Sequence, residues 1–226
     1  MGWRLNLLTE KHKAKLVASG WHAYHSGLSE TETLATEVAS IALTLGEIVP
    51  GRDGHPVEQI VPQEVASAYP GSLSSRFGLE TLPLHTDTAH WPIPCRYLVM
   101  ACAEPGPNPT PTILLDSRAV QITASEAKFC MSAVFLIRNG QRSFYGSIME
   151  RNRPFIRFDP GCMKAVTDDR VTEVDLFSLR RNERVIYRHE WTRGDILVID
   201  NWRVLHGRGV DSPTERGRKL LRAMVR

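Results

Sequence analysis

The sequence has no long apolar run, and this excludes several classes of protein. No stretch approaches the roughly 18 consecutive apolar residues that a membrane-spanning helix requires. The first residues, MGWRLNLLTEKHKAKLV, also lack the apolar core and the small-residue cleavage site of a secretory signal. We therefore expect a cytoplasmic protein with no membrane partner.

Cysteine is scarce, and no two cysteines form a CxxC pair. This spacing argues against a zinc knuckle and against a dithiol redox motif. In the cytoplasm we expect reduced thiols, most of them buried. The cysteines are Cys95, Cys102, Cys130 and Cys162.

The net charge is also small, at +3, but positive side chains are concentrated near the end of the sequence. They are Arg203, Arg208, Arg216, Arg218, Lys219, Arg222 and Arg226. A nucleic-acid-binding face usually adds a basic helix or a row of stacking aromatic residues, and neither pattern occurs here. We expect no nucleic-acid partner and a different anion for this cluster.

The length, composition and patterning fit a single domain that spans residues 1–226. A chain of 226 residues can bury most of its apolar surface around one core, and no compositional break suggests a linker. The clearest helix is expected over Ser29–Leu45, where Ser29 and Glu32 form an S-x-x-E capping box before apolar residues at helical spacing. Further helices are expected near Ser125–Ser132 and within Thr172–Asn182.

The rest of the sequence consists mostly of short apolar runs separated by Gly, Pro and Asp, which is typical of strands in a sandwich or barrel. We expect a mainly β fold with peripheral helices (α+β), a distorted antiparallel double-sheet jelly roll. The expected strands are Glu47–Val49, Val57–Val61, Tyr97–Ala101, Thr112–Leu115, Val134–Ile137, Phe155–Phe158, Val185–His189, Asp195–Ile199 and Lys219–Val225.

The first chemical motif is His85-Thr86-Asp87. In an extended segment, side chains two residues apart point the same way, so His85 and Asp87 can reach one metal ion. H-x-D is common by chance, however, and a surface hydrogen bond between the two residues is the simpler alternative.

The second motif surrounds His206. An apolar strand leads to Asp200-Asn201, and His206 follows between Leu205 and Gly207. A histidine in such a context is buried, either as a hydrogen-bonded core residue or as a ligand. Two imidazoles and one carboxylate make the facial set that suits iron(II) and leaves three coordination positions open.

The third motif is a pair of arginines near the end of the sequence. In a strand, Arg218, Leu220 and Arg222 share one face, and arginines inside a small barrel need an anion. An internal Asp or Glu could supply it. A carboxylate on a ligand would serve equally well, because the guanidinium fork binds carboxylate bidentately.

Together these motifs make the sequence resemble the taurine dioxygenase-like and clavaminate synthase-like branch of the iron(II)/2-oxoglutarate-dependent dioxygenases. The H-T-D motif, the string D-N-x-R-x-L-H-G-R over Asp200–Arg208 and the arginine pair occur in the family's order. The similar region runs from about Leu45 to Arg226. The resemblance implies a double-stranded β-helix, a cupin-like jelly roll.

The resemblance also implies roles for particular residues. His85, Asp87 and His206 would be the catalytic metal ligands, with Fe(II), 2-oxoglutarate and O2 as cofactor and cosubstrates. Arg218 would bind the distal carboxylate of 2-oxoglutarate together with Thr112, for which Thr110 is the rival. Arg222 would contact either the inner carboxylate of the cosubstrate or an acidic group of the substrate. The corresponding implied reaction is oxidation of a small molecule, with release of succinate and CO2. Hydroxylation is the default outcome, and desaturation, ring closure and epimerisation are the alternatives.

The sequence departs from the family pattern in two places. Asn108-Pro109-Thr110-Pro111 replaces the usual glycine pair before the threonine. The stretch between Asp87 and His206 is short, so we expect an open pocket or one completed by a partner subunit.

The residues and the resemblance together define the expected substrates and the alternatives. The substrate would be an amino acid, a small acid or a natural-product intermediate, and the presence of Asp87 argues against a halogenase. His90 and Trp91 would line the substrate pocket, with a packing role as the alternative for Trp91. Arg157 and Asp159 either approach the substrate or belong to a surface strand of alternating polarity. The competing functions are a non-catalytic jelly-roll module that binds an acidic ligand and a zinc-dependent hydrolase.

Overall fold

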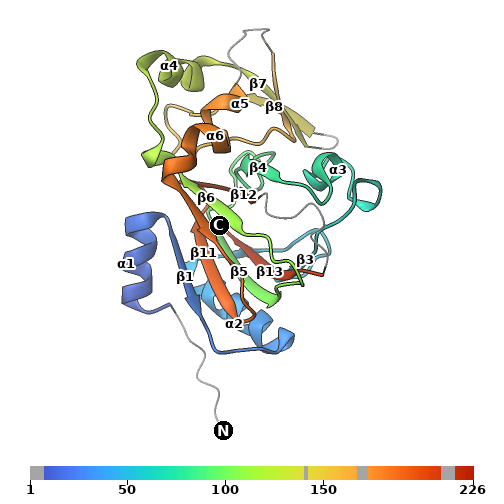
Figure 1. The fold of residues 1–226 in the computed structure, drawn as a ribbon. Coiled ribbons are helices and arrows are strands. Elements are labelled where there is room, and N and C mark those ends of the chain that lie inside the picture. Colours follow the sequence, from blue (N-terminus) through green and yellow to red (C-terminus); the bar gives the residue numbers. More distant parts are fainter. Residues whose placement is uncertain (1–7, 140–141, 167–172, 210–216) are drawn as a thin grey trace.

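The computed structural model describes residues 8–139, 142–166, 173–209 and 217–226. Two antiparallel sheets pack face to face, and a third, smaller sheet lies at one end with several helices (Figure 1). The prediction of a mainly β jelly roll with peripheral helices is confirmed.

The larger sheet, sheet A, has the strand order β1-β11-β5-β13-β2, and β3 also pairs with β13. Its outer face is covered by α2 (Thr31–Leu45), because Leu34, Val38, Ile41 and Ala42 pack against strands β5 and β13. The strands are β1 (Trp21–His25), β2 (Ile48–Val49), β3 (Glu58–Ile60), β5 (Tyr97–Glu104), β11 (Asp195–Asp200) and β13 (Lys219–Val225).

Sheet B has the order β10-β6-β12-β4, and its inner face meets that of sheet A. Alternate residues of both sheets form the core between them, as the two-residue repeat of strands requires. Leu98 and Leu197 contribute from sheet A, and Leu114 and Val204 from sheet B. The strands are β4 (Leu82–His85), β6 (Thr112–Asp116), β10 (Ile186–His189) and β12 (Val204–Arg208).

The opposite face of sheet B is covered by sheet C, of order β8-β7-β9, and by short helices. Ile113, Leu115 and Leu205 of sheet B pack there against Phe135 and Ile137. These elements are β7 (Phe135–Asn139), β8 (Arg142–Gly146), β9 (Met163–Ala165), α4 (Ala124–Ser132), α5 (Glu173–Leu176) and α6 (Leu179–Asn182). The remaining elements are α1 (Glu10–Ser19), α3 (Ser74–Phe77) and the 3-10 helices η1 (Val65–Ser67), η2 (Ser117–Ala119) and η3 (Glu183–Val185).

The structure corrects some boundaries of the predicted helices. The long helix begins at Thr31 with Glu30 as its N-cap, so the predicted capping box of Ser29 and Glu32 is wrong. The helix near Ser125–Ser132 is confirmed as α4, which has a capping box of its own. The third predicted helix is two short helices, α5 and α6, and its first residue, Thr172, lies outside the described residues.

One predicted strand is wrong. Residues Phe155–Phe158 form no strand, and only an isolated bridge joins Ile156 to Met149. The alternation of polarity that suggested a strand has another cause, since Arg157 turns inward to bind backbone carbonyls. The other predicted strands are found with shifts of their ends.

The cysteines are free thiols, as predicted. Cys95, Cys102 and Cys130 are buried, and Cys162 is half-buried. Among the described residues, no helix is long and apolar enough to cross a bilayer.

Candidate metal centre

The two predicted histidine ligands face each other across neighbouring strands. His85 ends β4, and His206 lies within β12, where the antiparallel register makes them direct partners. Their ring centroids are 4.5 Å apart, and both residues are about 7% exposed. Because His206 also pairs with Leu114 of the inter-sheet core, its imidazole points into the space between sheets A and B.

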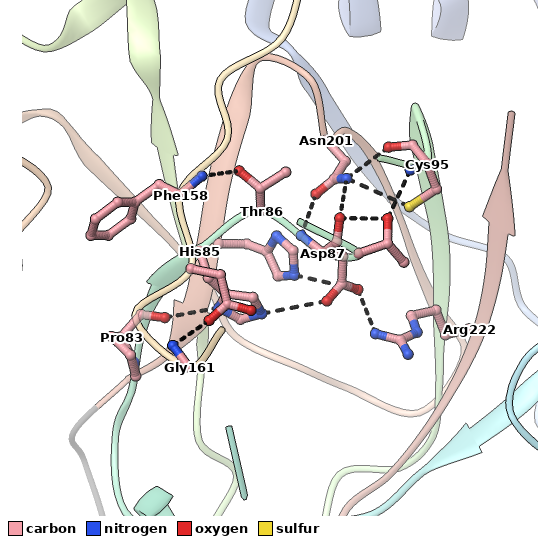
Figure 2. Close-up of polar contacts among 12 residues, drawn as sticks. Pro83, His85, Thr86, Asp87, Cys95, Phe158, Gly161, Asn201 and Arg222 are labelled. Carbon is pink, nitrogen blue, oxygen red and sulfur yellow. Dashed lines mark hydrogen bonds and ion pairs between the residues drawn. The ribbon is translucent and has the colours of Figure 1, made fainter. Parts of the chain in front are cut away.

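Asp87 completes the cluster. Its Oδ1 lies 3.5 Å from Nε2 of His85, and its Oδ2 lies 3.8 Å from Nε2 of His206. The three potential ligand atoms lie within 4.8 Å of one another, and no other such group of His, Cys, Asp and Glu exists among the described residues. Figure 2 shows the carboxylate of Asp87 between the imidazole of His85 and the guanidinium of Arg222.

The protonation states of Asp87 and His206 suit a cation, whereas the raised pKa of His85 favours a proton that a metal ion would have to displace. Burial lowers the pKa of His206 to about 3, so this imidazole is neutral and has a lone pair to donate. Burial opposes ionisation of Asp87, but the charge of Arg222 and a bond to His85 outweigh it and hold the pKa of Asp87 well below its usual value. Burial lowers the pKa of His85, but the bond and charge of Asp87 outweigh this, so its pKa is raised.

His85 is also oriented for metal binding. Its Nδ1 lies 2.8 Å from the carbonyl oxygen of Pro83. When Nδ1 carries the hydrogen and donates it to that carbonyl, the lone pair of Nε2 faces the centre, as in typical metal-bound histidines. A set of two imidazoles and one carboxylate therefore fits iron(II) and leaves room for further ligands.

Arg222 connects the cluster to sheet A. One guanidinium nitrogen donates to Oδ2 of Asp87, and Nε and Nη2 donate to Oε1 of Glu58 at 3.1 and 2.6 Å. Glu58 is the register partner of Arg222 across β3 and β13, so the ion pair is a direct cross-strand pair. The positive charge of Arg222 is thus balanced by a carboxylate on each side.

The backbone beside Asp87 is held by Asn201 and Thr88. Asn201 accepts a hydrogen bond from the N–H of Asp87 and donates to its carbonyl, at 2.9 and 3.1 Å. Thr88 has a left-handed backbone with φ of 55°, and its hydroxyl donates to the carbonyl of Asp87 and accepts from the N–H of Cys95.

Arg157 holds the next part of this loop. Its side chain is almost fully buried and donates to the carbonyl oxygens of Ala89, Trp91 and Pro92. The guanidinium also lies over the ring of Phe144, 5.0 Å from its centroid. Arg157 is therefore buried against backbone, and its interpretation as part of a surface strand is wrong.

Arg218 is buried and immediately precedes β13, and its guanidinium donates to the carbonyl of Thr110 at 2.8 Å.

The two candidate threonines differ in their contacts. The hydroxyl of Thr112 accepts a hydrogen bond from Nε1 of Trp191 at 2.9 Å and can still donate its own hydrogen. The hydroxyl oxygen of Thr110 is buried with no hydrogen-bond partner among the described residues.

Charged groups also surround His90, which sequence analysis placed near the substrate. Burial lowers the pKa of His90, Asp159 and Asp87 raise it, and Arg52 and Arg157 lower it. His90 and Asp159 therefore lie within electrostatic reach of the metal cluster.

The motifs in the sequence did not reveal Glu58 and gave no role to Asn201. Glu58 could not be found because its position depends on the register of a three-residue strand. For Asn201, the available signal was the polar Asp200-Asn201 break after an apolar strand.

The fold is similar to those of solved oxygenase structures. Asparagine oxygenase in complex with Fe(II), hydroxyasparagine and succinate is 17% identical, with a TM-score of 0.75 over 96% of this chain and 79% of that one. The non-haem iron oxygenase OrfP, in complex with Fe, succinate and dihydroxyarginine, is 18% identical, with a TM-score of 0.70 over 96% and 79%. PvcB from Pseudomonas aeruginosa is 20% identical, with a TM-score of 0.69 over 94% and 78%.

No curated protein matches the sequence. A family match, in contrast, covers most of the chain. Residues 29–224 match the family described as taurine catabolism dioxygenase TauD, TfdA family. This region includes the histidine pair, Asp87 and both arginines, Arg218 and Arg222. The chain therefore belongs to the TauD, TfdA family of dioxygenases.

Proposed function

We propose that this protein is an Fe(II)- and 2-oxoglutarate-dependent oxygenase that hydroxylates a free amino acid or a small amino-acid derivative. The observation that carries the proposal is the convergence of His85, Asp87 and His206 on one point inside a TauD-family jelly roll. When bound, iron and 2-oxoglutarate supply the activation of O2, with succinate and CO2 as the products of the cosubstrate.

The residues that would hold the cofactors follow from the geometry. His85 and His206 would offer Nε2, and Asp87 would offer a carboxylate oxygen, which leaves positions for a bidentate 2-oxo acid and O2. Arg218 would bind the distal carboxylate of 2-oxoglutarate, because it is buried and already aligned on the carbonyl of Thr110. Thr112 would assist, since the indole of Trp191 orients its hydroxyl.

Opposite charges beside the candidate metal site support a zwitterionic substrate. Arg222 could bind a carboxylate, and Glu58 could bind an ammonium group, if a substrate separates their ion pair. Asp159 provides a further negative charge near His85 and His90. Asparagine oxygenase and OrfP are solved with hydroxylated amino acids, which agrees with this class of substrate.

The buried arginine and the converging ligands distinguish this proposal from the two competing functions. A zinc-dependent hydrolase could use the same ligands, but it needs no buried arginine for a second carboxylate. A non-catalytic jelly-roll module would use the arginines alone and would not need three converging metal ligands. Both alternatives predict that 2-oxoglutarate is not consumed.

The direct test is a screen for substrate-stimulated release of succinate. The protein is loaded anaerobically with Fe(II), given 2-oxoglutarate, ascorbate and air, and offered a panel of L-amino acids and small acids. We expect one class of amino acid to raise succinate release and to gain one oxygen atom by mass spectrometry. Failure to bind Fe(II), or hydrolysis of a substrate with bound zinc, would overturn the proposal.

A further inference from the structure

Asp87 differs from the other two proposed ligands because it lies outside a strand. His85 and His206 belong to β4 and β12 and are register partners, so the hydrogen-bonded ladder of sheet B fixes their backbones. Asp87 lies two residues beyond the end of β4. Its position therefore depends on contacts other than the ladder.

Asn201 supplies contacts of the kind that a neighbouring strand would make. Its Oδ1 accepts from the N–H of Asp87 at 2.9 Å, and its Nδ2 donates to the carbonyl of Asp87 at 3.1 Å. The second hydrogen of Nδ2 is directed to the carbonyl of Cys95 at 2.7 Å. Asn201 is about 1% exposed, so water does not compete for these bonds. Figure 2 shows the amide between Asp87 and Cys95.

The amide also closes the loop that begins at Asp87. Thr88 adopts a left-handed conformation, which is strained for a residue with a side chain. Its hydroxyl bonds to Asp87 and Cys95, the same two residues that Asn201 contacts. Asn201 and Thr88 thus hold both ends of the loop together and fix the direction in which Asp87 leaves the backbone.

We propose that Asn201 is a positioning residue for Asp87 and sets the affinity of the centre for metal. The inference rests on the metal centre of the proposed function. Groups that orient a metal ligand typically change metal affinity roughly 10- to 100-fold when they are replaced.

A second buried asparagine provides a matched control. Asn182 of α6 is about 4% exposed, and its Nδ2 donates to the carbonyls of Leu176 and Ser178, both at 2.9 Å. Substitution of either asparagine by aspartate removes donors to two backbone carbonyls. Asn182 contacts none of the proposed ligands through these bonds.

The test compares Co(II) binding by the wild type, Asn201→Asp, Asn201→Ser and Asn182→Asp. Asn201→Ser is uncharged and too short to bridge Asp87 and Cys95, so it separates the loss of bonds from the added charge. Calorimetry gives the affinity, the visible absorption of Co(II) reports the coordination geometry, and circular dichroism verifies that each variant is folded. We expect both Asn201 variants to bind Co(II) roughly 10- to 100-fold more weakly with an altered spectrum.

We expect Asn182→Asp to lose stability but to keep the wild-type affinity and spectrum. Wild-type affinity in both Asn201 variants, or an equal loss in Asn182→Asp, would overturn the positioning role while leaving the metal centre intact. Failure of the wild type itself to bind Co(II) would overturn the metal centre and this inference with it.

Discussion

His85 and His206 are direct register partners in sheet B, with ring centroids 4.5 Å apart. Asp87 lies beside both imidazoles and also receives a hydrogen bond from Arg222 of sheet A. The centre therefore connects both sheets of the jelly roll. A metal bound there stabilises the folded state, because the unfolded chain does not bring these ligands together.

Asp87→Ala should abolish both oxidation of substrate and the stabilisation by metal. In the wild type, free Co(II) at 100 times its dissociation constant would raise the unfolding free energy by about 2.7 kcal/mol. Thermal unfolding with Co(II) and with EDTA measures this difference. Asp116→Ala removes a carboxylate that pairs with Arg203 instead, and it should keep the metal response. Hydroxylation by Asp87→Ala would contradict the proposed ligand set.

Arg218→Lys should weaken the binding of 2-oxoglutarate, because one ammonium group cannot make the two parallel hydrogen bonds of a guanidinium. We expect a higher concentration of 2-oxoglutarate for half-maximal succinate release and weaker anaerobic binding by calorimetry. Arg208→Lys is the matched control, since Arg208 is a buried arginine that binds the carbonyls of Gly78 and Glu80. The assignment is wrong if the two variants bind 2-oxoglutarate equally well.

The two candidate threonines can be distinguished by Thr112→Val and Thr110→Val. Thr112→Val should weaken 2-oxoglutarate binding and lower the unfolding free energy by about 1–3 kcal/mol, because the indole of Trp191 loses its acceptor. Thr110→Val should leave binding nearly unchanged. Calorimetry and urea unfolding of both variants provide the measurements, and the reverse pattern of affinities would assign the role to Thr110.

Arg157→Lys should loosen the loop that follows Asp87. A lysine cannot reach all three carbonyls, and a buried carbonyl without a donor costs about 1–3 kcal/mol. Hydrogen exchange should quicken at residues 88–95, and less of the succinate released should be coupled to substrate oxidation. Arg181→Lys is the control, because Arg181 pairs with Glu126 on the surface. Equal exchange in the wild type and Arg157→Lys would refute this role.

The free energy of unfolding should decrease as the pH is lowered, because of His22. Burial, His12 and Lys15 lower the pKa of His22 from 6.5 to about 4 in the folded state. Between about pH 4 and 6.5, the unfolded chain therefore binds a proton that the folded protein excludes. The contribution of neutral His22 to the unfolding free energy is complete above pH 6.5 and is lost as pH falls towards about 4. His22→Gln should reduce the pH dependence of urea unfolding across this range. An unchanged slope would show that His22 does not contribute.

Most of the apolar strands and the cluster of candidate ligands were predictable because each leaves a local signal, whereas β1, β4, β8, β9 and β12 were not predicted. Apolar runs such as Asp195–Ile199 are buried on both faces, and the H-x-D motif places its two ligands on one side of an extended segment. The helix α1 was not predicted, since only Leu16 of this lysine-rich helix is buried and the apolar period is weak. The strand predicted over Phe155–Phe158 was wrong because Arg157, which the alternating polarity of this segment placed on the surface, is buried.

Contacts that depend on register had no such signal. Glu58 meets Arg222 only because β3 pairs with β13 in one register, and three residues leave no pattern to reveal it. Asn201 was visible only as a polar break, since its partners Asp87 and Cys95 are distant in sequence.

The buried cysteines give the protein a built-in kinetic probe. Cys95 and Cys102 lie in the core between sheets A and B, whereas Cys130 lies beneath sheet C. Burial raises the pKa of Cys95 and Cys102 to about 12 and that of Cys130 to about 11, so each thiol is unreactive while its surroundings stay closed. The rate at which a thiol reagent labels each cysteine would therefore report how often the core around that cysteine opens to solvent.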